Sequence, residues 1–362
     1  MPEEQDTGDF ARLLDKLAGT HALELDEYER LLECRSPKSA QALAQRAVAQ
    51  RKQVYGNSVF TRGLIEVSSY CKNDCLYCGI RKSNSSVRRY RLTMEEIASS
   101  VDTGYELGFR TFVLQGGEDP FFTDKVLAEL VSRIREAHPD CAITLSFGER
   151  SRESYELLRR AGAERYLLRH ETASPGLYKC WHPESMSFDN RMRCLSDLRE
   201  IGYAVGVGFI VGAPFQTNAD LARDLKFIER FEPDMCGIGP FVPHHATPFA
   251  GFAAGTVDLT CYLLSILRLI EPNVLLPATT ALGTIAPDGR ERGILAGANV
   301  VMPNLSPVAH RRDYDLYDGK ICTGEEAAEC RGCLGARMLS VGYELVIDRG
   351  DKAPLPEGFT SA

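Results

Sequence analysis

The sequence lacks a long hydrophobic run. No stretch of its 362 residues approaches the roughly 18 consecutive apolar residues that a membrane-spanning helix requires. The first residues, MPEEQDTGDFARLL, are acidic and contain no apolar segment of the kind found in secretory signals. With 44% apolar and 25% charged residues, the composition is that of a soluble globular protein. We therefore expect a cytoplasmic protein without a membrane partner.

The sequence also lacks an excess of positive charge. Lys and Arg number 42 against 50 Asp and Glu, which gives a formal net charge of −8. Because no basic stripe is present to neutralise phosphates, no nucleic-acid partner is expected. Long linkers, low-complexity segments and short-period repeats are absent too, which favours a single catalytic domain.

Cysteine, by contrast, is plentiful. In a chain of this size without a secretory signal, 12 cysteines are not expected to form a disulfide scaffold. Six stand alone and are expected to be reduced, buried thiols. The other six form two tight groups: Cys71, Cys75 and Cys78, then Cys322, Cys330 and Cys333.

The pattern of apolar residues predicts an α/β protein. Residues 1–55 are predicted to be helical, and from Gly63 onward short apolar runs alternate with amphipathic helices. Strands are expected at 63–68, 111–115, 141–146, 165–169, 204–210, 234–238, 274–278 and 298–302. Eight strand–helix units match a parallel (β/α)8 TIM barrel, with a doubly wound open sheet as the alternative. We divide the chain into an N-terminal helical extension (1–55), the barrel (56–320) and a C-terminal segment bearing the second cysteine group (321–362).

The first cysteine group has the spacing C-x3-C-x2-C and follows the first expected strand, where barrel enzymes carry catalytic loops. A structural zinc site needs four closed ligands, and no fourth candidate lies nearby. Three thiolates instead indicate a [4Fe–4S] cluster with one iron left open. This motif resembles that of radical S-adenosylmethionine (SAM) enzymes. A zinc knuckle or a chance grouping is the alternative.

Two further segments fit this interpretation. The segment LQGGEDP (114–120) follows the second expected strand, and Gly116 and Gly117 would allow its backbone to approach a ligand closely. The segment RYLLRHETASP (165–175) ends a strand in charged residues, including Arg169 and Glu171. For 114–120 the simpler explanation is a tight turn. For 165–175 it is an ion pair at the rim of the barrel. The adjacent His244 and His245 are expected to point in different directions and to form a poor metal chelate.

From about Arg62 to Asp348 the chain resembles the HydE family of [FeFe]-hydrogenase maturases, which are related to biotin synthase. The resemblance rests on RGLIEVSSYCKNDCLYCGIR, VLQGGEDP, TLSFGER, RYLLRHETASP, MCGIGPFVPHHATP, LPATTALGTI, GANVVMPNLSP, YDLYDGKIC and CRGC. Methylornithine synthase, which shares the first motif, is the alternative within the same chemistry. An iron–sulfur scaffold or electron carrier without catalysis is the alternative of another class.

The resemblance implies two sets of ligand-binding residues. The contacts to the cofactor SAM would be Gly116, Gly117, Glu118, Ser146, Arg169, Glu171, Arg191 and Met235. The substrate residues would be Arg62, Gln115, Thr279 and Thr280 in the lower cavity, with Tyr314 and Tyr317 near its mouth. No catalytic residue is assigned beyond the cluster ligands.

The resemblance also implies a reaction and partners. The enzyme would cleave SAM to a 5′-deoxyadenosyl radical acting on an iron carbonyl–cyanide complex that carries cysteine, a precursor of the hydrogenase diiron subsite. Partners would be the tyrosine-cleaving radical SAM maturase, the GTPase scaffold, and ferredoxin or flavodoxin as electron donor. Cys322, Cys330 and Cys333 would hold a second cluster, [2Fe–2S] or [4Fe–4S], with surface zinc or free thiols as the alternative.

Overall fold

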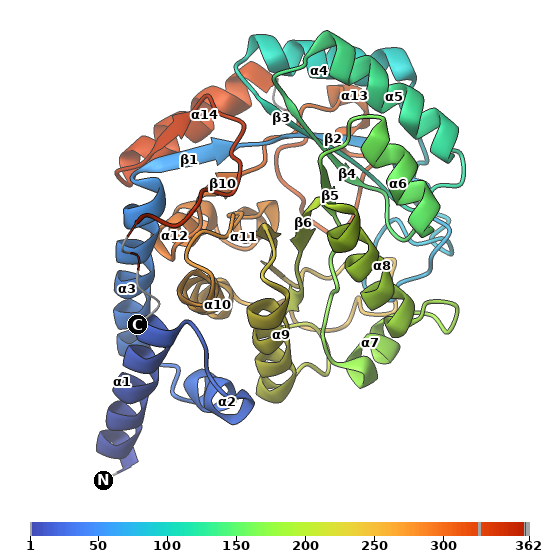
Figure 1. Ribbon diagram of the computed structural model, residues 1–362. Coiled ribbons are helices and arrows are strands. Elements are labelled where there is room, and N and C mark those ends of the chain that lie inside the picture. The colour runs from blue at the N-terminus through green and yellow to red at the C-terminus, as the bar shows by residue number, and fades with distance from the viewer. Residues whose placement is uncertain (1, 325–326, 358, 360–362) are drawn as a thin grey trace.

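A computed structural model describes residues 2–324, 327–357 and 359, and the side chains of all of these except residues 2–7, 327, 328 and 330. None of the helices in these ranges combines the length and apolar character needed to cross a bilayer. The fold belongs to the α/β class, with a parallel sheet inside and helices outside (Figure 1).

Six parallel strands form the main sheet, and they pair in chain order. They are β2 (Gly63–Ser68), β3 (Thr111–Gly116), β4 (Ala142–Ser146), β5 (Arg165–Leu167), β6 (Ala204–Val207) and β8 (Met235–Cys236). A doubly wound sheet reverses its strand order at one point, and these six strands contain no such reversal. Most of their buried residues are apolar, as expected of strands covered on both faces, and Glu66 of β2 and Arg165 of β5 are buried charged exceptions.

Isolated parallel bridges continue this order beyond β8. They join Met235 to Leu275, Pro277 to Val300 and, back at the first strand of the sheet, Asn304 to Leu64. Val300 belongs to β10 (Val300–Val301).

The strand expected at 274–278 is wrong as a regular strand, because this segment makes single bridges only. Pro277 has no N–H to donate, which interrupts a ladder. The preceding N–H, that of Leu276, donates to the side-chain oxygen of Asn299 at 2.9 Å instead of to a backbone carbonyl.

Two other expected strands are divided. The segment 204–210 forms β6 and then β7 (Ile210–Val211), and 234–238 forms β8, followed by β9 (Gly239–Pro240). The interruption lies where Gly208 approaches Gly237: a Cβ at Gly208 would lie 2.0 Å from the carbonyl oxygen of Gly237. β7 and β9 then pair with each other.

A second parallel sheet joins segments far apart in the sequence, and only one of its strands, within the expected 298–302, was predicted. Its strands are β10, β1 (Ser58–Thr61) and β11 (Glu344–Val346), with β1 in the middle. β11 follows α14 (Ala327–Ser340), which lies beside β1 in Figure 1. The chain after α14 therefore returns to pair with β1.

Helices cover the sheet. They are α4 (Met94–Glu106), α5 (Asp124–Ala137), α6 (Arg152–Arg160), α7 (Pro175–Trp181), α8 (Phe188–Ile201), α9 (Asn218–Phe231), α10 (Val257–Ile270), α11 (Thr280–Ile285), α12 (Gly289–Leu295) and α13 (Val308–Arg311). Their ends follow local sequence. Thr93 and Glu96 form a capping box at the start of α4, and Gly202 ends α8 in the left-handed conformation that glycine adopts without strain.

The N-terminal helices expected in 1–55 are α1 (Pro2–Thr20), α2 (Leu25–Glu33) and α3 (Pro37–Tyr55). They pack on α9 and α10, away from the sheet (Figure 1). The hydroxyl of Tyr28 donates to Glu229 Oε2 at 2.8 Å, and that of Tyr262 donates to the carbonyl of Leu31 at 2.7 Å. Buried aromatic rings with satisfied hydroxyls thus fix α2 to the helical layer.

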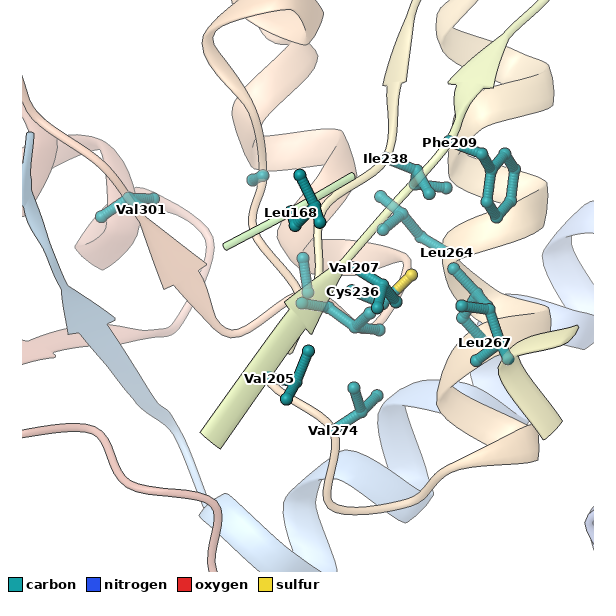
Figure 2. Packing of buried hydrophobic residues seen from close by; sticks show 14 of the residues in the cluster. Leu168, Val205, Val207, Phe209, Cys236, Ile238, Leu264, Leu267, Val274 and Val301 are labelled. Atoms are coloured by element: carbon teal, nitrogen blue, oxygen red, sulfur yellow. The ribbon is translucent and has the colours of Figure 1, made fainter. Parts of the chain in front are cut away.

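One large apolar core lies between the sheet and the helices. Figure 2 shows a part of it, in which Leu264 and Leu267 of α10 gather with Val207 and Cys236 of the strands. All four side chains are fully buried. Because burying apolar area contributes roughly 25 cal/mol per Å², this contact is what holds α10 against the sheet.

Candidate functional site

A cavity of about 400 Å³ lies at the carboxyl ends of the parallel strands. The last residues of β3 and β4 line it, among them Gln115, Gly116 and Ser146, and so does Leu168, just after β5. Active sites of parallel α/β folds are found at this end of the strands. The cavity is therefore the candidate active site.

The first cysteine group lines this cavity. Cys71, Cys75 and Cys78 all lie on the loop that follows β2. Backbone hydrogen bonds hold this loop at several points; for example, the Lys72 N–H donates to the carbonyl of Glu118 at 2.9 Å. The loop that follows β3 and carries Gly117 and Glu118 therefore binds the cysteine loop directly.

The geometry of the three thiols fits a cluster better than a single metal ion. A zinc ion about 2.3 Å from each sulfur would bring the sulfurs to within about 3.8 Å of one another. Among the described residues, the metal-binding groups whose ligand atoms all lie within 4.8 Å do not include these three sulfurs. In a cubane each thiolate binds a different iron, which requires wider spacing. Burial raises the pKa of Cys71 and Cys75, and that of Cys78 to about 12, so an iron cluster would supply the positive charge that thiolates need here.

Two glycines are needed for the close packing around the loop. A Cβ at Gly117 would lie 2.2 Å from the carbonyl oxygen of Tyr70 and 2.7 Å from Cys71 Cβ. Gly148 has a φ of +71°, and a Cβ there would overlap the side chain of Glu118. The backbone of Gly117 therefore lies against the cysteine loop, where no side chain fits, and its close approach to a ligand stays a prediction.

The charged residues predicted to contact SAM form one wall of the cavity. The Arg191 guanidinium donates through Nε to Glu149 Oε1 at 2.6 Å and through Nη1 to the Arg169 carbonyl. Arg169 Nη2 lies 3.2 Å from Glu171 Oε2. Three of these residues, Arg169, Glu171 and Arg191, line the cavity, so the wall carries both charge signs.

Several buried polar atoms around the cavity lack a hydrogen-bond partner among the described residues. Arg169 Nε and Thr279 Oγ1 have none, and Arg169 Nη2 and Glu171 Oε2 meet only each other, as the ion pair at 3.2 Å. Leaving such atoms unpaired costs about 1–3 kcal/mol each, so a ligand that pairs them would be bound favourably. A molecule with both amino and carboxylate groups, such as SAM, suits this set.

The structure brings most of the predicted substrate residues together. Gln115, Thr279, Thr280, Tyr314 and Tyr317 line the same cavity, as do the predicted SAM contacts Gly116, Gly117, Glu118, Ser146 and Met235. Gln115 Nε2 donates to the Tyr314 hydroxyl at 3.3 Å, and Arg290 Nη2 donates to Thr280 Oγ1 at 3.3 Å.

Arg62 lies elsewhere. It lines a separate pocket of about 30 Å³, and Met235 and Leu167 line both that pocket and the main cavity. Arg62 donates to Met235 Sδ, and its Nε and Nη2 have no hydrogen-bond partner in the part of the chain that the structure describes. Burial lowers its pKa to about 9. Met235 thus stands between Arg62 and the main cavity.

The sequence reading missed two charged residues of the cavity, Glu66 and Lys320. Lys320 Nζ lies 2.6 Å from Glu66 Oε1, and both side chains are more than nine-tenths buried. Asn304 Nδ2 donates to Glu66 Oε2 at 2.8 Å. A glutamate inside the apolar run GLIEV was the signal available in the sequence.

The second cysteine group is described only in part. The Cys322 sulfur accepts from Arg290 Nη2 at 3.4 Å, and Cys333 is exposed on α14. The side chain of Cys330 lies outside the described residues. Arg337, on the same helix as Cys333, pairs with Glu291, and this hydrogen bond raises the pKa of Arg337.

The expectation that His244 and His245 point in different directions is wrong. Their rings stack at 4.4 Å between centroids, and a nitrogen of each lies within 4.8 Å of an oxygen of Asp318. Both belong to a turn in which the Thr247 N–H donates to the His244 carbonyl at 3.1 Å, so their side chains do not alternate as on an extended strand. His244 Nδ1 accepts from the Ala246 N–H at 3.1 Å, so its Nε2 carries the proton and donates to Asp315 at 3.0 Å. The ligand atoms of His244, His245 and Asp318 all lie within 4.8 Å of one another, which does not support the expected poor chelate.

Comparison with known proteins agrees with this site. Residues 65–228 match the Radical SAM superfamily model. The chain is 45% identical over 294 residues to the [FeFe] hydrogenase maturase subunit HydE of Thermotoga maritima, covering 81% of this chain and 84% of the relative. The chain belongs to the HydE family. As a HydE family member it is a radical SAM enzyme and a hydrogenase maturase.

More distant relatives share the fold. The HydE family member is 30% identical to 3-methylornithine synthase of Methanosarcina barkeri over 88% of this chain and 90% of the relative. It superposes on the crystal structure of methylornithine synthase with a TM-score of 0.80 at 28% identity, covering 92% of this chain and 97% of that one. It also superposes on HydG, a maturase of the [FeFe]-hydrogenase, with a TM-score of 0.77 at 19% identity, covering 94% and 77%.

Proposed function

We propose that this HydE family member binds a [4Fe–4S] cluster through Cys71, Cys75 and Cys78 and uses it with SAM to build the diiron subsite of [FeFe]-hydrogenase. The observation that carries the proposal is the meeting of these three thiols with the charged wall of Arg169, Glu171 and Arg191 in one cavity. When bound, the cluster and SAM supply an electron transfer that yields a 5′-deoxyadenosyl radical.

The protein's own residues bind, orient and shield. Gly117 lets the loop after β3 approach the cysteine loop, where the amino group of SAM would lie. Arg169 Nε, which has no partner among the described residues, offers a donor to the polar groups of SAM, and Glu171 Oε2, which meets only Arg169 there, offers an acceptor. The apolar lining, including Leu168, Ile210 and Met302, excludes water from the reacting centre.

The substrate class follows from the family and fits the cavity. An iron carbonyl–cyanide complex carrying cysteine would lie among Gln115, Thr279, Thr280, Tyr314 and Tyr317, with Arg62 beneath Met235. Thr279 Oγ1 is buried and makes no hydrogen bond to any described residue, so it is available as a hydrogen-bond donor to such a ligand.

The finer structural and cellular assignments belong to the same proposal. The isolated bridges at Leu275, Pro277 and Asn304 support closure of the sheet into a (β/α)8 barrel. The residue divisions 1–55, 56–320 and 321–362 stay a prediction. So do cytoplasmic location, a second cluster at Cys322, Cys330 and Cys333, and partnership with the tyrosine-cleaving maturase, a GTPase scaffold and ferredoxin or flavodoxin.

Anaerobic reconstitution with iron and sulfide, followed by reduction and addition of SAM, tests the first step. Wild-type protein is expected to form 5′-deoxyadenosine, and Cys75→Ala is expected to form none. Cys180→Ala is the matched control, since Cys180 is an exposed, isolated thiol. An intact cluster without SAM cleavage in wild type would favour the scaffold alternative.

A second experiment separates the two enzymatic alternatives. Addition of the iron complex carrying cysteine is expected to raise 5′-deoxyadenosine formation above the substrate-free level, and addition of L-lysine is not. Stimulation by lysine with formation of methylornithine would assign the chain to the other activity.

A further inference from the structure

Glu66 and Lys320 form an ion pair inside the cavity that no step above uses. Their charged atoms lie 2.6 Å apart, and their side chains are 2% and 9% exposed. Both line the main cavity. A buried ion pair is seldom more stabilising than two apolar residues in its place, so this pair calls for another explanation.

The protein uses only part of the bonding capacity of Lys320. Its ammonium group has three donors, and in the described residues it makes two hydrogen bonds: to Glu66 Oε1 and, at 2.9 Å, to the Tyr314 carbonyl. Nζ also lies 4.9 Å from the centroid of the Tyr314 ring. Because these contacts fix the group at the cavity wall, its third N–H remains available to a ligand.

Glu66 also has capacity to spare. An ionised carboxylate can accept about four hydrogen bonds, and the described side chains supply two, from Lys320 and from Asn304 at 2.8 Å. The Glu66 N–H donates to Ser306 Oγ at 2.7 Å, which fixes the backbone at this position. Lys320 and Asn304 hold the carboxylate in place, and it keeps lone pairs that can accept from a ligand.

A fixed cation beside a fixed anion is complementary to a zwitterion. We infer that Lys320 binds the carboxylate and Glu66 the ammonium group of an α-amino-acid end of the substrate. The inference rests on the proposed function, in which the iron complex carries cysteine, and adds how that cysteine is recognised. Charge-assisted hydrogen bonds of this kind make the pair a determinant of specificity.

Three synthetic iron carbonyl–cyanide complexes that differ only in the thiol ligand test this inference. The ligands are cysteine, cysteamine, which lacks the carboxylate, and 3-mercaptopropionate, which lacks the amine. The measured quantity is the KM for substrate-stimulated formation of 5′-deoxyadenosine. For the wild type, each truncated complex is expected to show a KM higher by roughly ten- to a hundredfold, the loss of one charge-assisted hydrogen bond.

The variants are expected to show a crossed pattern. Lys320→Met should show the same KM for the cysteine and cysteamine complexes and a higher KM for the mercaptopropionate complex. Glu66→Gln should show the same KM for the cysteine and mercaptopropionate complexes and a higher KM for the cysteamine complex. Lys320→Arg should retain much of the wild-type preference. Lys125→Met, on the exposed face of α5, is the matched control and should behave as wild type. If the ion pair only stabilised the fold, the variants would have a lower free energy of unfolding but would not show this crossed pattern of KM values.

Failure of the inference and failure of the proposed function give different results. If all three complexes stimulate wild type equally, or if the variants keep the wild-type preferences, the inference is wrong and the proposed function stands. If no complex stimulates wild-type protein that still cleaves SAM alone, the proposed function fails, and the inference fails with it. Substrate-free SAM cleavage reports whether each variant is folded. If Lys320→Met is not folded, the KM values of Glu66→Gln decide whether the inference is right.

Discussion

The hydroxyl of Tyr77 lies 3.1 Å from Nε2 of His182. His182 Nδ1 lies 2.9 Å from the Tyr178 carbonyl and donates to it, so Nε2 is unprotonated and accepts from Tyr77. Tyr77 stands between Cys75 and Cys78 in the sequence. This neutral histidine therefore anchors the cysteine loop to α7.

The first prediction concerns the pH dependence of this anchor. Burial lowers the pKa of His182 to about 3, against 6.5 for an unperturbed histidine. Its contribution to stability is therefore present above pH 6.5 and is lost as the pH falls toward 3. Between pH 7.5 and 5.5, wild type should lose about 1.4 kcal/mol of unfolding free energy relative to His182→Gln. Urea denaturation of both cluster-free proteins measures this, and a constant difference would contradict it.

The second prediction concerns Gly117. Gly117→Ala would place a Cβ 2.2 Å from the Tyr70 carbonyl oxygen, so the cysteine loop has to move. We expect the iron content after reconstitution to fall and SAM cleavage to drop at least tenfold. Gly176→Ala is the control, since a Cβ there meets no atom within 4 Å. Normal iron content in Gly117→Ala would show that the loop tolerates the displacement.

The third prediction concerns Arg191. Replacement by Met removes the cationic partner of the mostly buried Glu149 and leaves it only the neutral amide of Asn190, and a buried charge without a counter-charge costs about 3–5 kcal/mol. Arg191→Lys keeps the charge but loses the fork that bonds Glu149 and the Arg169 carbonyl together. For Arg191→Lys we expect the Kd for SAM to rise about tenfold in equilibrium binding. Arg160→Lys, at an exposed position, should leave it unchanged. Unaltered SAM binding in Arg191→Lys would exclude this residue from the SAM site.

The fourth prediction concerns the second cysteine group. If it holds a cluster, Cys333→Ser and Cys330→Ser should each lower the iron content by that cluster alone, with SAM cleavage retained. The reason is that Cys71, Cys75 and Cys78 lie on a different loop and keep their own iron. Iron and sulfide analysis with Mössbauer spectroscopy measures this, and Cys180→Ser serves as control. Equal iron in all of these variants would assign free thiols to the group.

The sequence by itself determined the chemistry of the cysteine loop and most of the helices. Three thiols at fixed spacing on one loop need no distant contact to be recognised, and capping signals such as Thr93 with Glu96 act within one turn. The apolar runs of β2, β3 and β4 were predicted for the same reason, because the strand period is local.

Only the tertiary structure decided which distant residues meet. Pro277 and the side chain of Asn299 turn the expected strand at 274–278 into single bridges, and the contact of Gly208 with Gly237 divides two others. The structure likewise placed Arg62 in a separate pocket next to Met235. It also brought Lys320 to Glu66 across 254 positions of the chain. Such pairings depend on how whole elements pack, which local propensity does not encode.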